Sequence, residues 1–296
     1  DVFFAAALDW IDEQRQQPGP FFAYISTNAP HDPMIAPQAY KQPFLDAGFD
    51  EHTAARYGMI ANIDHNMGVL RDRLKAWDLD PNTLLIFMTD NGQAVSHGKR
   101  DGETYPLHVA GLRARKGSVH EGGTRVPCFW HWKETLSEGQ DVDALTAHID
   151  LYRTLAELAG GDVPEEQVEG RSLIGLLDDP EASWPERLLF VHRGRWPKGA
   201  NPDDHQYEGC AVRSPKYRLI DHQQLFDIQT DPGETTNVAA EHPEEVARLQ
   251  KAFDQWWPEA RSRMVNEDVP NASEAPFWVD YQHQLETEGI PTWTPR

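Results

Sequence analysis

The sequence predicts an α/β fold, with a mostly parallel sheet covered by helices on both faces and a small carboxyl-terminal antiparallel sheet packed by a helix. Three observations predict it. A strand, a helix and a second strand follow one another within the first ninety residues. The second of these strands is continuously apolar, and short β-like runs separated by Pro, Gly and Asp follow after about residue 181.

The first ninety residues contain the strand–helix–strand succession. Residues 20–26 are apolar and rich in aromatic side chains, and turn-forming residues bound them on both sides, which favours a buried strand. From Ala55 to Trp77 apolar side chains recur every three or four residues, which predicts a helix that ends before Asp80-Pro81-Asn82. Residues 83–88 are apolar without alternation, which is typical of a parallel strand covered on both faces.

The remaining elements define the expected domain organisation. Residues 126–132 have strand character, and a helix is predicted from Val142 to Ala159, where Gly160-Gly161 stops it. A closing helix is predicted from Pro243. The short β-like runs of the antiparallel sheet are residues 188–192, 210–212, 217–220 and 225–228. We therefore expect an α/β domain over residues 1–180, an α+β subdomain over residues 181–264 and an extended tail over residues 265–296.

Composition excludes several classes of protein. The chain has 296 residues, of which 39% are hydrophobic and 25% charged, so it can bury a globular core. Its net charge of -21 argues against nucleic acid or an anionic membrane as a general partner. No apolar run approaches the roughly 18 residues of a membrane-spanning helix. Two cysteines exclude a disulfide-rich scaffold, and neither lies in a C-x-x-C motif.

Polar residues at two predicted strand ends form a candidate site, because ligands of parallel sheets bind outside the carboxyl ends of the strands. Asp90 and Asn91 offer a carboxylate and an amide oxygen, the hard donors that Ca²⁺ or Mg²⁺ prefers, although Asp-Asn-Gly also suits a plain tight turn. Residues 91–125, which follow them, are Gly-rich and carry six Lys or Arg against three acids. A loop this long is functional or disordered in most domains, and a solvated basic loop is the alternative.

His31 follows the first predicted strand, between Pro30 and Asp32 in a stiff segment. One interpretation is a surface histidine of a loop. The other is a hydrogen-bond donor to a substrate oxygen or a proton carrier to a leaving group, because the unperturbed pKa of histidine is near neutrality.

Three segments, in this order, resemble the sulfatase family of the alkaline-phosphatase-like superfamily: Ala29-Pro30-His31, Thr89-Asp90-Asn91-Gly92, and residues 115–127 with the sequence RKGSVHEGGTRVP. Weaker similarities extend the resemblance to roughly residue 255. They are residues 148–160, where Arg153 stands in place of a common Pro, Glu169-Gly170-Arg171-Ser172-Leu173, and residues 225–237 with the D-P-x-E-x-x-N pattern.

The resemblance implies a calcium-dependent hydrolase of aryl or carbohydrate sulfate esters, with the alkaline-phosphatase-like fold. Asp90 and Asn91 would be ligands of one Ca²⁺, and His31 and Lys116 would be the catalytic residues that contact the sulfate group. Lower-ranked candidates for substrate binding are His120, Lys99 and Arg125, with His97 beside them, and a structural role is the alternative for each. The resemblance also implies a periplasmic or secreted location; the oligomeric state is not predicted.

The nucleophile of this family is a formylglycine made from Cys or Ser in a C-x-P-x-R or S-x-P-x-R motif, and this sequence contains neither motif. The Asp-Asp pair and the Lys-x-His of the family are absent too. Because the family places all of these upstream of its A-P-H segment, we expect that an amino-terminal part is not included and that the 296-residue chain alone is inactive.

Two alternative functions stay open. One is a phosphatase, phosphodiesterase or phosphonate hydrolase of the same superfamily, although the D-x-x-x-H-x-x-x-H spacing of two-metal phosphatases is absent. The other is a non-catalytic protein that binds an anion or a carbohydrate on the same scaffold. The aromatic residues Phe277, Trp278, Tyr281 and Trp293 either line a sugar cleft or simply pack.

Overall fold

The computed structural model describes residues 1–165, 168–197, 199–264 and 276–289. They form two compact units. The first unit combines Asp1–Asp80 and His97–Pro106 with the described residues of Glu267–Arg296. The second unit combines Pro81–Ser96 with Leu107–Asn266. Within the described residues, no helix has the length and apolar character that crossing a membrane requires.

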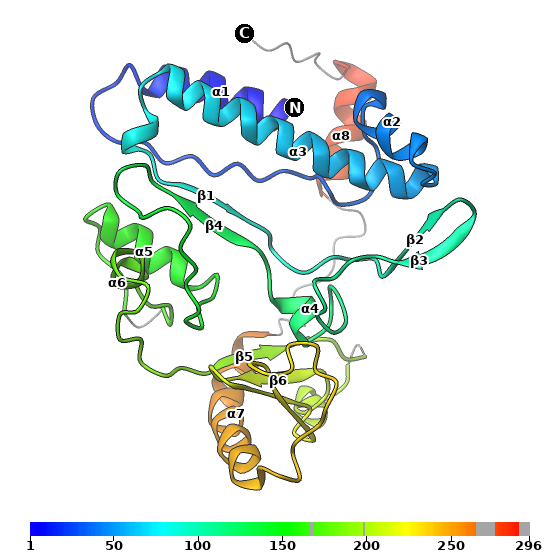
Figure 1. Ribbon diagram of the computed structural model, residues 1–296, viewed down its shortest axis with the longest axis vertical. Helices are drawn as coiled ribbons and strands as arrows, with labels where there is room; N and C mark the ends of the chain where they lie inside the picture. Colours follow the sequence, from blue (N-terminus) through cyan, green and yellow to red (C-terminus); the bar gives the residue numbers. More distant parts are fainter. Residues whose placement is uncertain (166–167, 198, 265–275, 290–296) are drawn as a thin grey trace. The chain divides into compact units, whose positions relative to one another are not determined.

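The first unit is built around the long helix α3, which contacts α1 and α2 (Figure 1). Asp50 caps the start of α3, where its carboxylate accepts a hydrogen bond from the N–H of Thr53 at 3.1 Å. The carbonyl oxygen of Lys99 accepts a hydrogen bond from the N–H of Asp50, and this bond joins the β2–β3 hairpin to the start of α3. The elements of the unit are α1 (Val2–Gln14), α2 (Gln38–Asp46), α3 (Glu51–Ala76), β2 (His97–Arg100), β3 (Glu103–Pro106) and α8 (Pro276–Thr287), with the short helix η1 (Asp80–Asn82) at the boundary.

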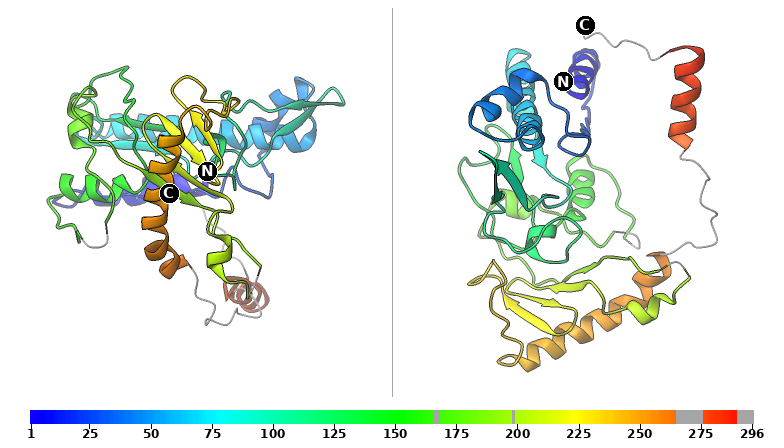
Figure 2. Two further views of the ribbon diagram at one scale, coloured as in Figure 1. Left: turned by 90° about the horizontal axis from the view of Figure 1, so that it is seen from below. Right: turned by 90° about the vertical axis from the view of Figure 1, so that its right-hand side faces the viewer.

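The second unit contains a four-stranded antiparallel sheet in the order β5-β6-β7-β8, as the sequence predicts for this region. Helix α7 (Pro243–Met264) packs along this sheet (Figure 2). Leu249, Phe253 and Trp257 of α7 form one hydrophobic core with Cys210, Val212, Leu219 and Leu225 of the strands. The strands are β5 (Leu189–His192), β6 (Cys210–Arg213), β7 (Tyr217–Ile220) and β8 (Gln224–Asp227).

The rest of the second unit carries Asp90, Asn91 and Lys116 of the predicted site. Strand β1 (Leu85–Met88) pairs antiparallel with β4 (Cys128–His131), with Met88 opposite Cys128. The remaining elements are short helices: α4 (Glu121–Thr124), α5 (Asp150–Leu158), α6 (Ile174–Asp178) and η2 (Pro202–His205).

Several predictions about these elements are wrong. Residues 20–26 form no strand, because no neighbouring strand among the described residues pairs with them, and Phe22 and Tyr24 are 69% and 84% exposed. The apolar run that ends at Met88 pairs antiparallel, and the described residues contain no parallel pair. The helix predicted from Val142 begins only at Asp150, whose buried carboxylate accepts the N–H of Ala147.

Two further differences concern segments without a firm sequence pattern. The tail predicted as extended contains α8, which includes Tyr281, while Trp293 lies outside the described residues. The basic stretch 91–125 is not one continuous loop, because it contains the β2–β3 hairpin and α4.

Candidate functional site

The Asp90 turn, residues 89–92, follows directly after β1. Asp90 is exposed, and its Oδ1 accepts the N–H of Asn91 at 2.9 Å. The side chain of Asn91 donates through Nδ2 to the carbonyl oxygen of Gly92 at 2.9 Å. Asp90 Oδ2 and Asn91 Oδ1 therefore bond to no residue that the structure describes, and both stay available as oxygen donors. His148, which the sequence analysis did not single out, donates from Nε2 to the carbonyl of Thr89 at 2.8 Å and supports the turn.

Backbone hydrogen bonds join the Lys116 loop, residues 113–120, and the helix α4 that follows it to the Asp90 turn and to Gln93 directly after that turn. The N–H of Lys116 donates to the carbonyl of Gln93 at 3.0 Å, and the N–H of Gly92 donates to the carbonyl of Gly123 at 3.1 Å. The side chain of Lys116 is exposed and forms no ion pair with a described residue. The structure thus joins the backbone segments that carry Asp90, Asn91 and Lys116, the two oxygen donors and the cation predicted from the sequence.

Glycines allow this close approach. A Cβ atom on Gly92 would lie 1.8 Å from the carbonyl oxygen of Gly122. One on Gly122 would lie 2.4 Å from the oxygen of Arg113, and one on Gly123 would lie 2.3 Å from the oxygen of Ser118. Because each of these contacts is with backbone, no side-chain movement can relieve it. The Gly-Gly pair after Glu121 is therefore a packing requirement of the Lys116 loop.

Two predicted site residues, His31 and Lys99, belong to the first unit. His31 is exposed, and its Nδ1 lies 3.0 Å from the carbonyl oxygen of Asp32. Lys99 is exposed on strand β2. Their roles at the site stay predictions, as does the role of His97.

Arg125 and His120 lie at opposite ends of the short helix α4. Arg125 is 61% exposed at its side chain, and its Nη1 is 3.8 Å from Glu121 Oε2. His120 contacts the carboxyl-terminal sheet region, because its Nδ1 lies 3.0 Å from Glu234 Oε1 and its ring packs against Phe226 at 6.4 Å between centroids.

Glu121 anchors α4 to the carboxyl-terminal sheet and is only 2% exposed. Its Oε1 accepts from Arg218 Nη2 at 2.6 Å and Nε at 3.1 Å, and from Arg213 Nε at 2.9 Å. Burial alone would raise the pKa of Glu121, but the charges of Arg218 and Arg213 outweigh burial and hold that pKa below its usual value. Glu121 is therefore an ionised structural carboxylate.

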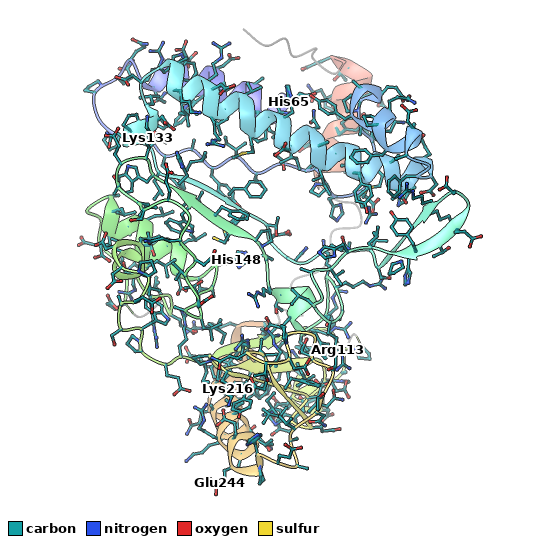
Figure 3. All side chains as sticks on the ribbon, in the orientation of Figure 1. His65, Arg113, Lys133, His148, Lys216 and Glu244 are labelled. Carbon is teal, nitrogen blue, oxygen red and sulfur yellow. The ribbon has the colours of Figure 1, made fainter. Side chains whose placement is uncertain are left out.

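Glu234 completes this buried charged cluster and is 1% exposed. Its Oε2 accepts the N–H of Glu121 at 2.9 Å, and its own carbonyl accepts from Arg113 Nη1 at 2.9 Å. The side chain of Arg113 lies where the Lys116 loop meets the carboxyl-terminal sheet (Figure 3). Sequence reasoning missed Glu234, Arg213 and Arg218, although Glu234 is the Glu of the D-P-x-E-x-x-N pattern and the pattern could have pointed to it.

The family follows from the matched regions of the chain. The family model described as Sulfatase matches residues 1–161, more than half of the chain and the whole Asp90–Lys116 arrangement. The chain belongs to the sulfatase family. A second model, N-sulphoglucosamine sulphohydrolase, C-terminal, matches residues 114–260 of this sulfatase-family chain, which include Glu234 and the strands that carry Arg213 and Arg218. The resemblance predicted from the sequence is confirmed.

Individual relatives agree with the family. The chain is 27% identical over 273 residues to an N-acetylgalactosamine-6-O-sulfatase of Bacteroides thetaiotaomicron, covering 86% of this chain and 50% of the relative. It is 26% identical over 277 residues to human Arylsulfatase A, covering 84% and 51%. The crystal structure of Ps i-CgsB in complex with k-i-k-neocarrahexaose matches with 26% identity and a TM-score of 0.76, covering 97% of this chain and 60% of that one. The chain spans about half the length of the curated relatives it matches.

The described residues of this sulfatase-family chain provide only part of the ligand set that a bound cation needs. Asp90 and Asn91 provide two hard oxygens, whereas Ca²⁺ takes about six to eight. Among the described residues, no group of three or more His, Cys, Asp or Glu side chains is placed to hold a metal ion. The donors present fit one side of a calcium site, and the exposed ammonium of Lys116 suits an anionic group bound beside it.

Proposed function

We propose that this chain supplies the carboxyl-side part of the active site of a sulfuric ester hydrolase. One observation carries the proposal: two backbone hydrogen bonds join the segments that carry Asp90, Asn91 and Lys116, and among the described residues Asp90 Oδ2, Asn91 Oδ1 and the Lys116 ammonium have no partner. Sulfatase relatives across the chain support the same reaction. A buried Nε2 of Gln93 without a partner among the described residues further supports a site that other groups complete.

The proposed division of roles follows from charge. Asp90 and Asn91 would hold one Ca²⁺, which when bound offsets negative charge on the sulfuryl oxygens. Lys116 binds the sulfate group and stabilises the charge that develops on it as the ester S–O bond breaks. His120, Lys99 and Arg125 are lower-ranked contacts to the rest of the substrate.

His31 is the proposed proton donor to the departing alcohol oxygen. Its Nδ1 faces the carbonyl oxygen of Asp32, which can only accept, so the N–H is on Nδ1 and Nε2 is the nitrogen that carries the exchangeable proton. The formylglycine nucleophile is proposed to lie in a C/S-x-P-x-R motif upstream of Asp1. The mostly parallel alkaline-phosphatase-like sheet, with the domain boundary near residue 180, belongs to the same proposal and requires strands beyond those described, because the described strands pair antiparallel.

The substrate class is proposed from the relatives. One relative is named N-acetylgalactosamine-6-O-sulfatase, and a similar solved structure is a complex with k-i-k-neocarrahexaose. Both support a sulfated carbohydrate as the substrate. An aryl sulfate is the simpler ester with which hydrolysis is tested.

The test compares two proteins on matched aryl sulfate and aryl phosphate esters. We expect no turnover by the 296-residue chain and hydrolysis of the sulfate in preference to the phosphate by the protein encoded with its upstream region. Lys116→Ala should lower kcat/KM for the sulfate by about 10²–10³-fold. Lys251→Ala, which removes an exposed lysine from α7, is the charge-matched control and should leave activity unchanged.

Three results would contradict the proposal. Turnover of aryl sulfate by the isolated chain would show that no upstream nucleophile is needed. An upstream sequence without C/S-x-P-x-R would remove the expected nucleophile, and a preference for phosphate would favour the alternative hydrolase class.

A further inference from the structure

Glu234 bridges two groups of the site region with its two carboxylate oxygens. Oε1 lies 3.0 Å from His120 Nδ1, and Oε2 accepts the N–H of Glu121 at 2.9 Å. The contact spans 114 positions of the chain, and Glu234 is fully enclosed at 1% exposure. Both oxygens of Glu234 therefore contact His120 and Glu121, the residues that connect the Lys116 loop to α4.

This geometry fixes the tautomer of His120. A carboxylate oxygen accepts hydrogen bonds, and Oε2 of Glu234 already accepts the N–H of Glu121. We therefore assign the hydrogen of the Oε1 contact to Nδ1 of the imidazole. The second ring nitrogen, Nε2, then carries the lone pair in the neutral ring and a proton in the charged ring. Nε2 is also the ring nitrogen without a partner among the described residues, and the side chain keeps 17% of its surface exposed.

We propose that Glu234 is a positioning residue of this sulfatase-family site, which holds His120 as the Nδ1–H tautomer and so directs Nε2 to be the nitrogen that meets a substrate. The same carboxylate secures the first turn of α4, from which Gly123 accepts the N–H of Gly92. Contact of His120 with a sulfate ester rests on the proposed function. The assignment of Glu234 as the residue that sets the tautomer of His120 is independent of the proposed function.

Glu234→Gln tests the assignment without changing side-chain size. The amide oxygen of Gln must face the N–H of Glu121, because an amide NH₂ there would place donor against donor. The NH₂ group then faces Nδ1 of His120 and requires a lone pair on it. The substitution should therefore invert the tautomer from Nδ1–H to Nε2–H, a change that mere loss of packing would not produce.

The measurement is nitrogen-15 NMR of the histidine rings in the 296-residue chain, at a pH where the neutral form of His120 is seen. The signals are assigned with His120→Gln. The wild-type protein should show a protonated-type Nδ1 and an unprotonated-type Nε2, and Glu234→Gln should show the reverse. His205, whose Nδ1 lies 2.7 Å from the exposed carboxylate of Glu208, is the internal control and should keep its spectrum.

A wild-type His120 with its hydrogen on Nε2 would overturn the assignment, as would the same tautomer in both proteins. If Glu234→Gln fails to fold, the wild-type spectrum alone decides. Because the spectra do not depend on turnover, the expected tautomers together with absent sulfatase activity of the protein encoded with its upstream region would refute the proposed function and leave the role of Glu234 standing.

Discussion

Arg218 is the residue whose loss should most weaken the attachment of the Lys116 loop to the carboxyl-terminal sheet. Its side chain is 4% exposed and gives two hydrogen bonds to Glu121 Oε1. It also donates to the hydroxyl of Thr124 at 3.0 Å and to the carbonyl of Val119. Arg218→Met keeps much of the side-chain volume and removes all of these donors.

The size of the effect follows from what remains around Glu121. Removing one partner of a buried ion pair costs about 3–5 kcal/mol, because an uncompensated charge stays buried. Arg213 Nε remains 2.9 Å from the same carboxylate oxygen, so we expect the lower end, about 3 kcal/mol. Arg213→Met is the matched control: it leaves both bonds from Arg218 in place and should cost about 1.5 kcal/mol, the value of one hydrogen bond to a charged group.

The assay is equilibrium unfolding in urea, followed by tryptophan fluorescence, on the 296-residue chain and both variants. Urea is preferred to guanidinium chloride because a salt would screen the ion pairs under study. The reasoning is refuted if Arg218→Met loses less than about 1 kcal/mol, or if Arg213→Met is the more destabilised variant.

Three other predictions concern single positions. Gly92→Ala should cost about 1–3 kcal/mol in the same urea assay, because its Cβ would overlap a backbone oxygen, whereas Gly68→Ala in α3 meets no atom within 4 Å and should be neutral or stabilising; equal effects would contradict this. Burial lowers the pKa of His222 below 6.5, so in this pH range the imidazole binds a proton more weakly in the folded chain than in the unfolded chain. The free energy of unfolding should therefore fall as the pH drops from about 7.5 to 5.5. His222→Asn should reduce that fall, and an unchanged pH dependence would disprove it. Tyr24→Lys should reduce self-association in light scattering more than Tyr152→Lys, because an exposed apolar extended segment can pair with another chain; an equal reduction would count against the segment.

Elements with strong local signals were predictable from the sequence. The apolar stripe of α3 and the acidic first turn of α7 place both helices within a few residues of their observed starts. Strands β5 to β8 were found because turn-forming residues separate short apolar runs. In each case the signal and the structure lie in the same ten or twenty residues, so no distant contact is needed to interpret them.

Pairing of strands was not predictable, because a hydrophobic run shows only that a segment favours burial. Residues 20–26 carry the composition of a buried strand, yet extended backbone becomes a strand only beside a partner. Residues 85–88 are a strand as predicted, but a continuous apolar run does not specify the direction of the neighbour, and β4 runs antiparallel to it. The helix expected from Val142 was predicted too long because periodicity did not reveal that the buried Asp150 carboxylate binds the N–H of Ala147 and so fixes a turn before the helix.

The candidate site divides in the same way. Proximity of Asp90, Asn91 and Lys116 was expected from strand ends and from the resemblance, and backbone hydrogen bonds join the glycine-rich segments that carry them. The buried residues that hold the Lys116 loop in place lie 92 to 121 positions away from the residues they contact. A local sequence pattern cannot predict a contact between residues that lie so far apart in the sequence.

The carboxyl-terminal sheet is therefore part of the site and not only a neighbour of it. Without that sheet Glu121, 2% exposed in the folded chain, would lose both of its arginines, and its N–H would lose the carboxylate of Glu234. Burying an unpaired carboxylate is unfavourable, so α4, which carries Glu121, would shift. Gly123 of α4 would shift too, and its carbonyl oxygen accepts the N–H of Gly92. This hydrogen bond joins α4 to the Asp90 turn, and the Lys116 loop leads directly into α4. The position of both segments therefore depends on side chains from β6, β7 and the segment after β8.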